Sequence, residues 1–323
     1  MNILGRLVAA LSIVVLAVPG DATRAQDLKD KVIKIVVPFP AGGTADIIAR
    51  LIGQQATQDT GQKIIIENRP GAGTIIGTEV VARSAPDGTS LLMMSNSFVI
   101  NAVVRASLPY DPMSLEPVCF LVDSPQVLVV HESSPFRSLK DLVEAAKAKP
   151  GELSYATVGP ATTQHIAGEM FKQAAQINLT YVPFTGGAPA VNAILGGHVT
   201  SVLTNYNEVM EHVHSGKLRA LAVTSRERLK QLPNVPTFME AGYKDYETSA
   251  FFGLVAPAKT PRETIARLAT MLTSALRALA VTEKLVAQGL DVVGTCEDNF
   301  RAHIKRQYEK YVRAVKEAGI RAE

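Results

Sequence analysis

The sequence has no tryptophan, only two cysteines and little net charge. Lys and Arg number 33 and Asp and Glu number 30, which gives a formal net charge of +3 over 323 residues. No basic run carries interleaved aromatic residues, so we expect no nucleic-acid partner. The chain also lacks a Gly-x-Ser-x-Gly motif, and Cys119 has no neighbouring base in the sequence. Nucleophilic catalysis therefore has no candidate residue, and we expect a protein that is not an enzyme.

Charged residues are scarce at 20% of the chain, whereas apolar residues make up 47%. This balance is typical of a globular protein with one or two domains. Residues 1–25 have the order of a secretory signal peptide, with Arg6, an apolar core at residues 7–18 and a cleavage site ending at Ala25. The core is too short to span a bilayer comfortably, so export to the periplasm is favoured over a membrane anchor.

Export would permit a disulfide between the two cysteines. Cys119 lies in the apolar run of residues 117–122, and this setting favours an unpaired, buried small side chain. The sequence alone does not decide whether the sulfur of Cys119 meets that of Cys296, because pairing depends on distance and direction in the fold.

A glycine turn follows the first predicted strand. Residues 33–37 are an apolar run typical of a short buried strand, and Pro38 ends it because proline cannot donate to a ladder. The pair Gly42-Gly43 then leads into a helix with an apolar face, which Thr44 or Asp46 could cap. A strand, a glycine turn and a helix N-terminus together favour an anion site.

The same device recurs in the second half of the chain. The run VPFTGG at residues 182–187 opens another helix, with Val191, Ile194 and Leu195 on one face. When Gly42-Gly43 is laid on Gly186-Gly187, the glycine and apolar positions that follow also match. Two matched turns predict two similar lobes that face each other across a ligand cleft.

Strands and helices alternate along most of the chain, which is typical of an α/β fold with parallel sheets. The chain leaves the first lobe once and returns once, so two crossings near Val127 and Gly253 would make a hinge. We expect strands at residues 33–37, 63–67, 90–95, 127–130, 153–157, 199–203, 218–224 and 251–255, and helices that include 74–84, 138–149, 261–279 and 300–318.

Many short motifs resemble the Bug-type receptors, the extracytoplasmic solute-binding proteins of tripartite tricarboxylate transporters. They cover essentially the whole chain after the signal peptide, in order. They are VPFPAGGTAD at residues 37–46, ENRPGAG at 67–73, APDG at 85–88, LPYD at 108–111, GELSY at 151–155, TQHIAG at 163–168, VPFTGG at 182–187, GKLRALAVT at 216–224, PNVPT at 233–237, EAG at 240–242 and GLVAP at 253–257.

The resemblance implies a two-lobed periplasmic binding protein of type II topology, which captures a small organic carboxylate and delivers it to integral-membrane permease subunits. Residues 26–125 and 253–323 would form the first lobe and residues 126–252 the second. No metal, cofactor or catalytic residue is implied, and we expect a monomer. Ligand contacts would come from Phe39, Pro40, Ala41, Gly42, Gly43, Thr44, Asp46 and Ser95 in the first lobe, and from Gly159, Ala161, Thr162, Thr163, His165, Phe184, Thr185, Gly186, Gly187 and Asn205 in the second.

A few positions depart from the family pattern and leave the ligand open. An acid usually precedes Asn205, where this chain has Thr204, and a Trp is common where Phe251 and Phe252 stand. The form of residues 95–97 is also uncommon. An exported enzyme or a sensor on the same fold remains the alternative, because a fold does not fix a function.

Several candidate residues keep two interpretations. Asp46 is expected to be a helix cap first and a ligand contact second. His165 is expected either to line the cleft or to be structural. His212 and His214 lie one residue apart, and a solvated pair is favoured over a metal site because no third ligand lies nearby in the sequence.

The two glycine loops contain no Arg or Lys, so backbone N–H groups at helix starts would hold the carboxylate. Asp46 is the one acid in the expected cleft segments, and an ammonium group would lack a partner there. We therefore expect a mono- or dicarboxylate without a free amine, whose body packs on Phe39 and Phe184.

Overall fold

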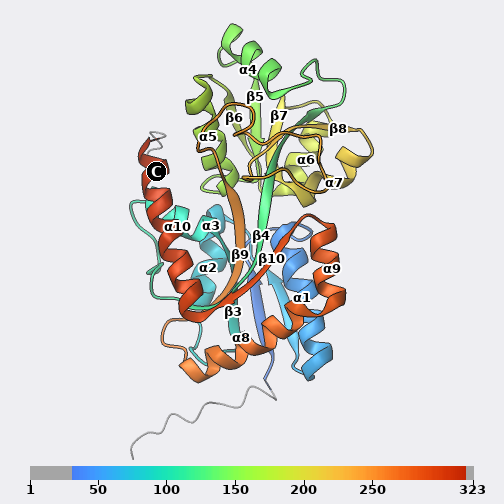
Figure 1. The fold of residues 1–323 in the computed structure, drawn as a ribbon. Helices are drawn as coiled ribbons and strands as arrows, with labels where there is room; N and C mark the ends of the chain where they lie inside the picture. Colours follow the sequence, from blue (N-terminus) through green and yellow to red (C-terminus); the bar gives the residue numbers. More distant parts are fainter. Residues whose placement is uncertain (1–30, 318–323) are drawn as a thin grey trace, which may run out of the picture.

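The computed structural model describes residues 31–317, so the predicted signal peptide lies outside the described residues. The chain folds into two lobes, one above the other in Figure 1, with strands β4 (Glu116–His131) and β9 (Ser249–Ala256) running along the axis between them. All ten strands of the described chain belong to one continuous sheet. Helices flank the sheet on both sides in each lobe (Figure 1).

The first lobe starts with the predicted alternation of strands and helices. β1 pairs in parallel with β2 on one side and with β3 on the other. The bounds of β1 and β3 are the predicted ones, whereas the helix α3 after β3 was not expected. The elements are β1 (Ile33–Val37), α1 (Thr44–Thr60), β2 (Ile64–Asn68), the short helix η1 (Ala72–Thr74), α2 (Ile75–Ala82), β3 (Ser90–Ser95) and α3 (Asn96–Val104).

The second lobe repeats this pattern around three parallel strands. β5 pairs in parallel with β6 and with β7, and helices connect them. β4 and β8 complete this part of the sheet. The elements are α4 (Leu139–Ala148), β5 (Ser154–Thr157), α5 (Thr163–Ala175), β6 (Thr180–Pro183), α6 (Gly187–Leu195), β7 (Ser201–Asn205), α7 (Tyr206–His214) and β8 (Leu218–Val223).

The strand β4 is common to both lobes. Its first part, residues 116–125, pairs with β9, and residues 126–131 pair with β7 and β8. The predicted strand 127–130 is only the last part of this element. The return crossing precedes β9, because all of β9 pairs with the first part of β4. The predicted boundary between residues 252 and 253 thus falls inside β9.

The chain ends on the first lobe. The predicted helix 261–279 is confirmed as α8 (Arg262–Arg277), and the last predicted helix is confirmed as α10 (Glu297–Glu317). The helix α9 (Leu279–Ala287) and the strand β10 (Asp291–Cys296) were not predicted. Within residues 31–317, only the pair α8 and α9 together has the length and apolarity of a membrane span, and that pair bends by 67°.

Each lobe buries apolar side chains on both faces of its part of the sheet. In the first lobe, Ile48 and Ile52 of α1 pack with Leu272 of α8 on one face, and Phe98 of α3 packs with Phe300 of α10 on the other. The second lobe has two comparable clusters. Burial on both faces explains why the parallel strands read as continuous apolar runs in the sequence.

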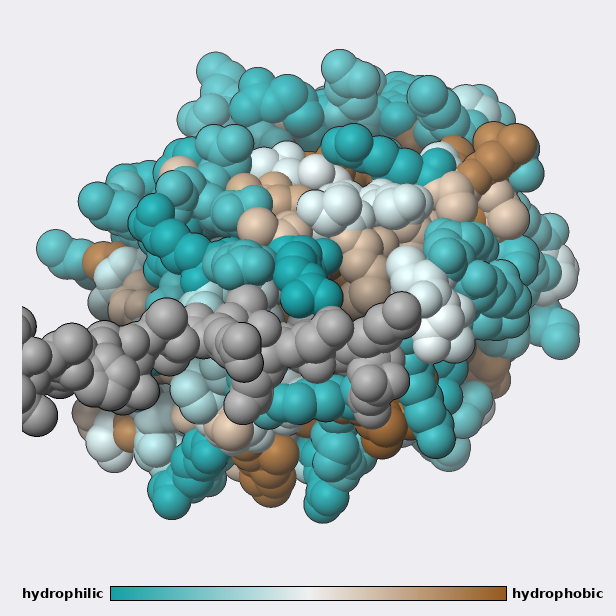
Figure 2. Space-filling view, turned by 90° about the horizontal axis from the view of Figure 1, so that it is seen from below, coloured by the Kyte–Doolittle hydropathy of each residue, from teal (hydrophilic) through white to brown (hydrophobic). Residues whose placement is uncertain are grey.

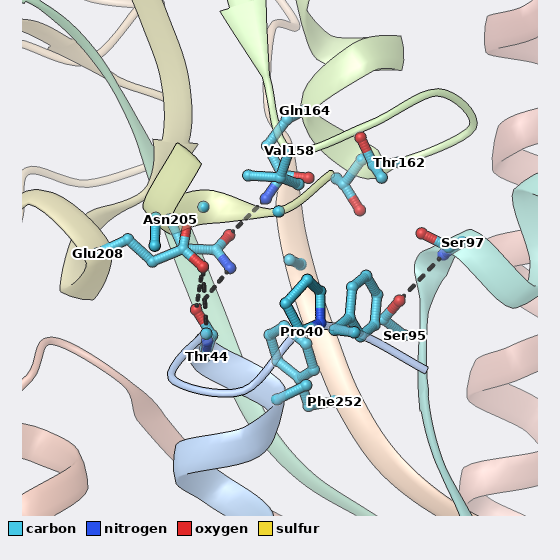
Figure 3. Close-up of a pocket in the computed structure, with 18 of the residues that line it drawn as sticks. Pro40, Thr44, Ser95, Ser97, Val158, Thr162, Gln164, Asn205, Glu208 and Phe252 are labelled. Atoms are coloured by element: carbon cyan, nitrogen blue, oxygen red, sulfur yellow. Dashed lines mark hydrogen bonds between the residues drawn. The ribbon is translucent and has the colours of Figure 1, made fainter. Parts of the chain in front are cut away.

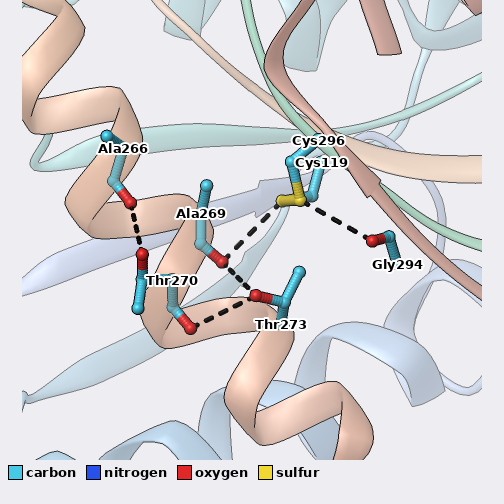
Figure 4. Close-up of a disulfide and its surroundings, with 7 residues drawn as sticks. All are labelled: Cys119, Ala266, Ala269, Thr270, Thr273, Gly294 and Cys296. Atoms are coloured by element: carbon cyan, nitrogen blue, oxygen red, sulfur yellow. Dashed lines mark hydrogen bonds between the residues drawn. A yellow bond between two sulfur atoms is a disulfide. The ribbon is translucent and has the colours of Figure 1, made fainter. Parts of the chain in front are cut away.

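Cys119 and Cys296 form a disulfide, so the interpretation of Cys119 as an unpaired side chain is wrong. The antiparallel pairing of β4 with β10 puts the two residues opposite each other, with their Cα atoms 3.9 Å apart. Figure 4 shows the bond beside the turn of α8 at Ala269. Cys119 is fully buried, as its apolar neighbours predict. The sequence analysis did not predict β10, the strand that carries Cys296, and so it could not place Cys296 opposite Cys119.

The lower end of the first lobe is mainly hydrophilic where it can be seen. Figure 2 shows this face, and the hydrophobic residues in view are scattered among hydrophilic ones. Scattered exposed apolar residues are normal on a protein surface and need no partner.

Candidate ligand-binding site

Five helices begin at one cavity between the lobes. The starts of α1 and α3 reach it from the first lobe, and those of α5, α6 and α7 reach it from the second. The enclosed space measures about 40 Å³. The first N–H groups of a helix have no partner within it and carry the positive end of its dipole. Five such helix starts around one cavity favour a bound anion.

Asp46 shapes the first glycine loop from behind the cavity. Its Oδ2 accepts hydrogen bonds from Gly42 N and Arg50 Nε, both at 2.9 Å, and its Oδ1 accepts one from Asn68 Nδ2 at 2.9 Å. Burial by itself would raise the pKa of Asp46, but the hydrogen bonds from Arg50, Gly42 and Asn68 outweigh it and hold the pKa below its usual value. Asp46 thus stays ionised and keeps Gly42 at a positive φ of 82°.

The second glycine loop meets the first across the cleft. Gly186 has φ of 140°, a conformation that favours glycine. A Cβ atom on Gly186 would lie 3.0 Å from Pro40 Cγ, so the two loops approach as closely as a missing side chain permits. The two matching glycine turns of the sequence therefore lie against each other, one on each side of the cleft.

Thr44 is the centre of the hydrogen bonds between the lobes. Its hydroxyl accepts from Asn205 Nδ2 at 2.9 Å, and it lies within donating distance of Glu208 Oε1 at 3.1 Å and of Asn207 Oδ1 at 3.0 Å. Its backbone N–H donates to Glu208 Oε1 at 3.4 Å. Figure 3 shows Asn205 and Glu208 reaching from the second lobe toward Thr44 at the start of α1.

Polar side chains at the starts of α3 and α5 complete the cavity wall. Ser95 Oγ caps α3 by accepting from Ser97 N at 3.3 Å, and Thr162 Oγ1 caps α5 by accepting from His165 N at 3.3 Å. Gln164 Nε2 donates to Asn205 Oδ1 at 2.9 Å. These caps fix the direction in which the helix starts face the cavity.

The comparisons with known proteins assign this architecture to a family. A family model described as the tripartite tricarboxylate transporter family receptor matches residues 48–320. The chain belongs to this receptor family. Protein BugT of Bordetella pertussis is 35% identical to this receptor over 292 residues, which is 90% of each chain.

Solved structures agree with the receptor in fold as well as in sequence. That of the periplasmic binding protein BugD is 32% identical with a TM-score of 0.86, and the match covers 90% of this receptor and 99% of BugD. That of R. palustris Rpa4515 with adipate is 31% identical with a TM-score of 0.86, and the match covers 90% of this receptor and 98% of Rpa4515. The predicted fold class and the resemblance to Bug-type receptors are confirmed.

The receptor brings most of the predicted contact residues together at the cavity, from both lobes. Four others lie elsewhere. Asp46 lies behind the loop, Gly42 is an exposed residue of the loop, Ala161 is packed in the core, and the ring of His165 stacks on Tyr181 with centroids 4.3 Å apart. The predicted residues that line the cavity are Phe39, Pro40, Ala41, Gly43, Thr44, Ser95, Thr162, Thr163, Gly186, Gly187 and Asn205.

Three predicted residues line a neighbouring hollow instead. Gly159, Phe184 and Thr185 border a space of about 430 Å³, which shares Phe39 and Pro40 with the cavity. This second hollow lies on the other side of the first glycine loop, between residues of both lobes.

The sequence did not reveal Glu208, which is the one acid that lines the cavity. Its carboxylate accepts from Thr44 and from the Thr204 hydroxyl. Burial raises the pKa of Glu208, and the hydrogen bonds from Thr204 and Thr44 partly oppose this. Glu208 lies in the first turn of α7, shortly after Asn205, and no local pattern in the sequence sets it apart from other acids at helix starts. Within residues 31–317, no group of three or more His, Cys, Asp or Glu side chains could hold a metal ion.

Proposed function

We propose that this receptor is an extracytoplasmic solute-binding protein that captures a small organic carboxylate between its lobes and delivers it to the membrane permease of a tripartite transporter. The ligand contacts are the predicted residues at the cavity, and the lobes turn about the crossings between residues 125–127 and before residue 249. The chain acts as a monomer after cleavage near Ala25.

One observation carries the proposal. Helix starts from both lobes surround a cavity, and among residues 31–317 no Lys, Arg or His lines it. Such a site can hold a carboxylate through backbone N–H groups and hydroxyls, and it is complete only when the lobes are close together. The structure of the relative Rpa4515 with adipate supports a carboxylate as the ligand class.

Binding to the mature chain tests this function. Isothermal titration with a panel of small mono- and dicarboxylates should give saturable binding with one site for each chain. NMR spectra of the ligand before and after incubation should be the same, because a receptor releases its ligand unchanged. No binding to any acid of the panel, or consumption of the bound acid, would contradict the proposal and favour the enzyme alternative.

A further inference from the structure

The carboxylate of Glu208 lies where the two glycine loops converge. A Cβ atom on Gly187, the first residue of α6, would lie 2.3 Å from Glu208 Cδ, and one on Gly43 would lie 3.7 Å from Glu208 Oε1. Thr44 N, in the first turn of α1, donates to the same Oε1 at 3.4 Å. The chain's own carboxylate thus fills the space between the starts of α1 and α6.

The partners of Glu208 mark this space as an anion site. Its hydrogen-bond donors are the N–H and hydroxyl of Thr44 and the hydroxyl of Thr204, and none of them carries a charge. In the part of the chain that the structure describes, no Lys, Arg or His lines the cavity to balance the carboxylate. Burial raises the pKa of Glu208, and the ionised carboxylate faces the positive ends of two helix dipoles instead of a cation. An ammonium group at the same place would face those ends with the wrong sign.

The space left beside Glu208 is small and largely apolar. About 40 Å³ remains, bordered by the rings of Phe39 and Phe252 and by Val158. Within the described residues, no hydrogen bond joins Glu208 to the starts of α3 and α5, where Ser97 and Thr163 line the cavity and Ser97 N donates to Ser95 Oγ. The hydroxyls of Ser97 and Thr163 can donate to one further carboxylate there.

We propose that Glu208 supplies one carboxylate of the site itself, so that this receptor takes a small monocarboxylate where the relative Rpa4515 takes a dicarboxylate. The ligand's single carboxylate lies at the starts of α3 and α5, and its apolar body lies against Phe39 and Phe252. A dicarboxylate would have to place its second carboxylate at the donors of Thr44 and Thr204, which Glu208 already occupies, and two carboxylates side by side repel each other. This inference rests on the proposed function.

Matched pairs of acids test the inference. Titrations should compare butyrate with succinate and valerate with glutarate, on the wild type and on Glu208→Ser, which frees both the donors and the space. We expect the wild type to bind each monocarboxylate at least tenfold more tightly than its dicarboxylate partner. Glu208→Ser should reverse that order. Glu211→Ser is the matched control, because Glu211 is an exposed acid on the same helix, and it should keep the wild-type order.

Each other outcome has a stated meaning. A wild type that prefers dicarboxylates, or a folded Glu208→Ser variant that gains no dicarboxylate affinity, overturns the inference and leaves the proposed function standing. Glutamate bound more tightly than glutarate by the wild type, with the preference lost in Glu208→Gln, assigns Glu208 to an ammonium group and also overturns it. If no variant binds any carboxylate, the proposed function fails and the inference fails with it. Thermal unfolding of each variant establishes that it is folded.

Discussion

Asp46 shows how a single side chain can shape a loop of the cavity without lining the cavity itself. It stands at the third position of α1, and it accepts from the N–H of Gly42, which precedes the helix. Asn68 connects this carboxylate to the carbonyl oxygen of Phe39. The ring of Phe39 and the N–H groups of the loop are therefore held in place by one buried acid, which leaves the cavity free of its charge.

Asp123, by contrast, carries a charge that the folded state disfavours. Burial raises its pKa to about 6, with the negative charges of Asp291 and Glu247 adding to the effect, while the Ser249 hydroxyl and Lys310 oppose it. Because the folded pKa lies above the unfolded one, the folded state loses stability as the pH rises from about 4 to 6, and the loss is complete above pH 6. Asp123→Asn should therefore unfold less readily than the wild type at pH 7.5, by about 2–3 kcal/mol.

Denaturant unfolding at several pH values checks this prediction. The difference between Asp123→Asn and the wild type should shrink as the pH falls from 7.5 to 4.5, because the wild-type carboxyl becomes neutral. Asp298→Asn is the control, since the Asp298 side chain is 85% exposed and its change should be small throughout. A gain in stability that does not depend on pH would contradict the assignment to Asp123.

At the scale of elements, the disulfide joins β4 to β10 across most of the chain. Cys119 and Cys296 are 177 residues apart, and the enclosed segment contains the whole second lobe. Closing so long a loop restricts the unfolded chain, which in the chain-entropy model stabilises the fold by about 5 kcal/mol. We expect the double variant Cys119→Ala/Cys296→Ala to lose about 2–5 kcal/mol, with ligand affinity nearly unchanged, because neither cysteine lines the cavity.

Unfolding with and without a reducing agent provides the measurement. The wild type should lose stability on reduction to the level of the double variant, and the double variant should not respond to the reductant. Full reduction of the wild type, established by thiol labelling, with no change in its unfolding midpoint would show that the bond adds nothing.

The start of α6 requires a residue without a side chain. Gly187→Val would place Cβ against the carboxyl group of Glu208, so Glu208 or the helix start must move. We expect at least a tenfold loss of ligand affinity in a variant that still folds. Arg69→Ala is the comparison, since Arg69 pairs with Glu67 in a half-exposed ion pair outside the cavity. Wild-type affinity in Gly187→Val together with lost affinity in Arg69→Ala would contradict binding by helix starts.

Elements with a strong local signal could be predicted, and those set by distant partners could not. The strands β1 and β3 are near-continuous apolar runs. Pro38 ends β1, and Ser95, which caps α3, ends β3. The strand β10 is half-buried and contains Gly294, so it takes its strand form from pairing with β4. The pairing of Cys119 with Cys296 depends on that same contact, so it was hidden for the same reason.

The cavity that both lobes build could be predicted from the sequence only where the two lobes repeat the same glycine turn. The two matched glycine turns predicted two facing loops. The predicted residues that lie together at the cavity are those at helix starts. The sequence analysis did not identify Glu208, because its role depends on a contact between the two lobes. That contact joins Glu208 to Thr44, which is 164 residues away in the sequence. No local pattern marks such a contact, and the first turn of α7 looks like any other helix start.

The lobes should open when the hydrogen bonds at Thr44 are removed. Asn205, Asn207 and Glu208 of the second lobe all bond to this one residue of the first, and each lost bond weakens the closed form by about 0.5–1.5 kcal/mol. In the absence of ligand, Thr44→Ala should therefore have a larger radius of gyration than the wild type in small-angle X-ray scattering. At saturating ligand the two radii should agree, because a ligand that contacts both lobes stabilises the closed form in either protein.

Thr57→Ala is the matched control, because the Thr57 hydroxyl bonds only within α1, to Gly53 O, and it should scatter as the wild type does. Equal radii of Thr44→Ala and the wild type without ligand would contradict this role of Thr44 and would mean that other contacts between the lobes, such as Gln231 Nε2 to Val286 O and Lys310 Nζ to Glu247 O, keep them closed.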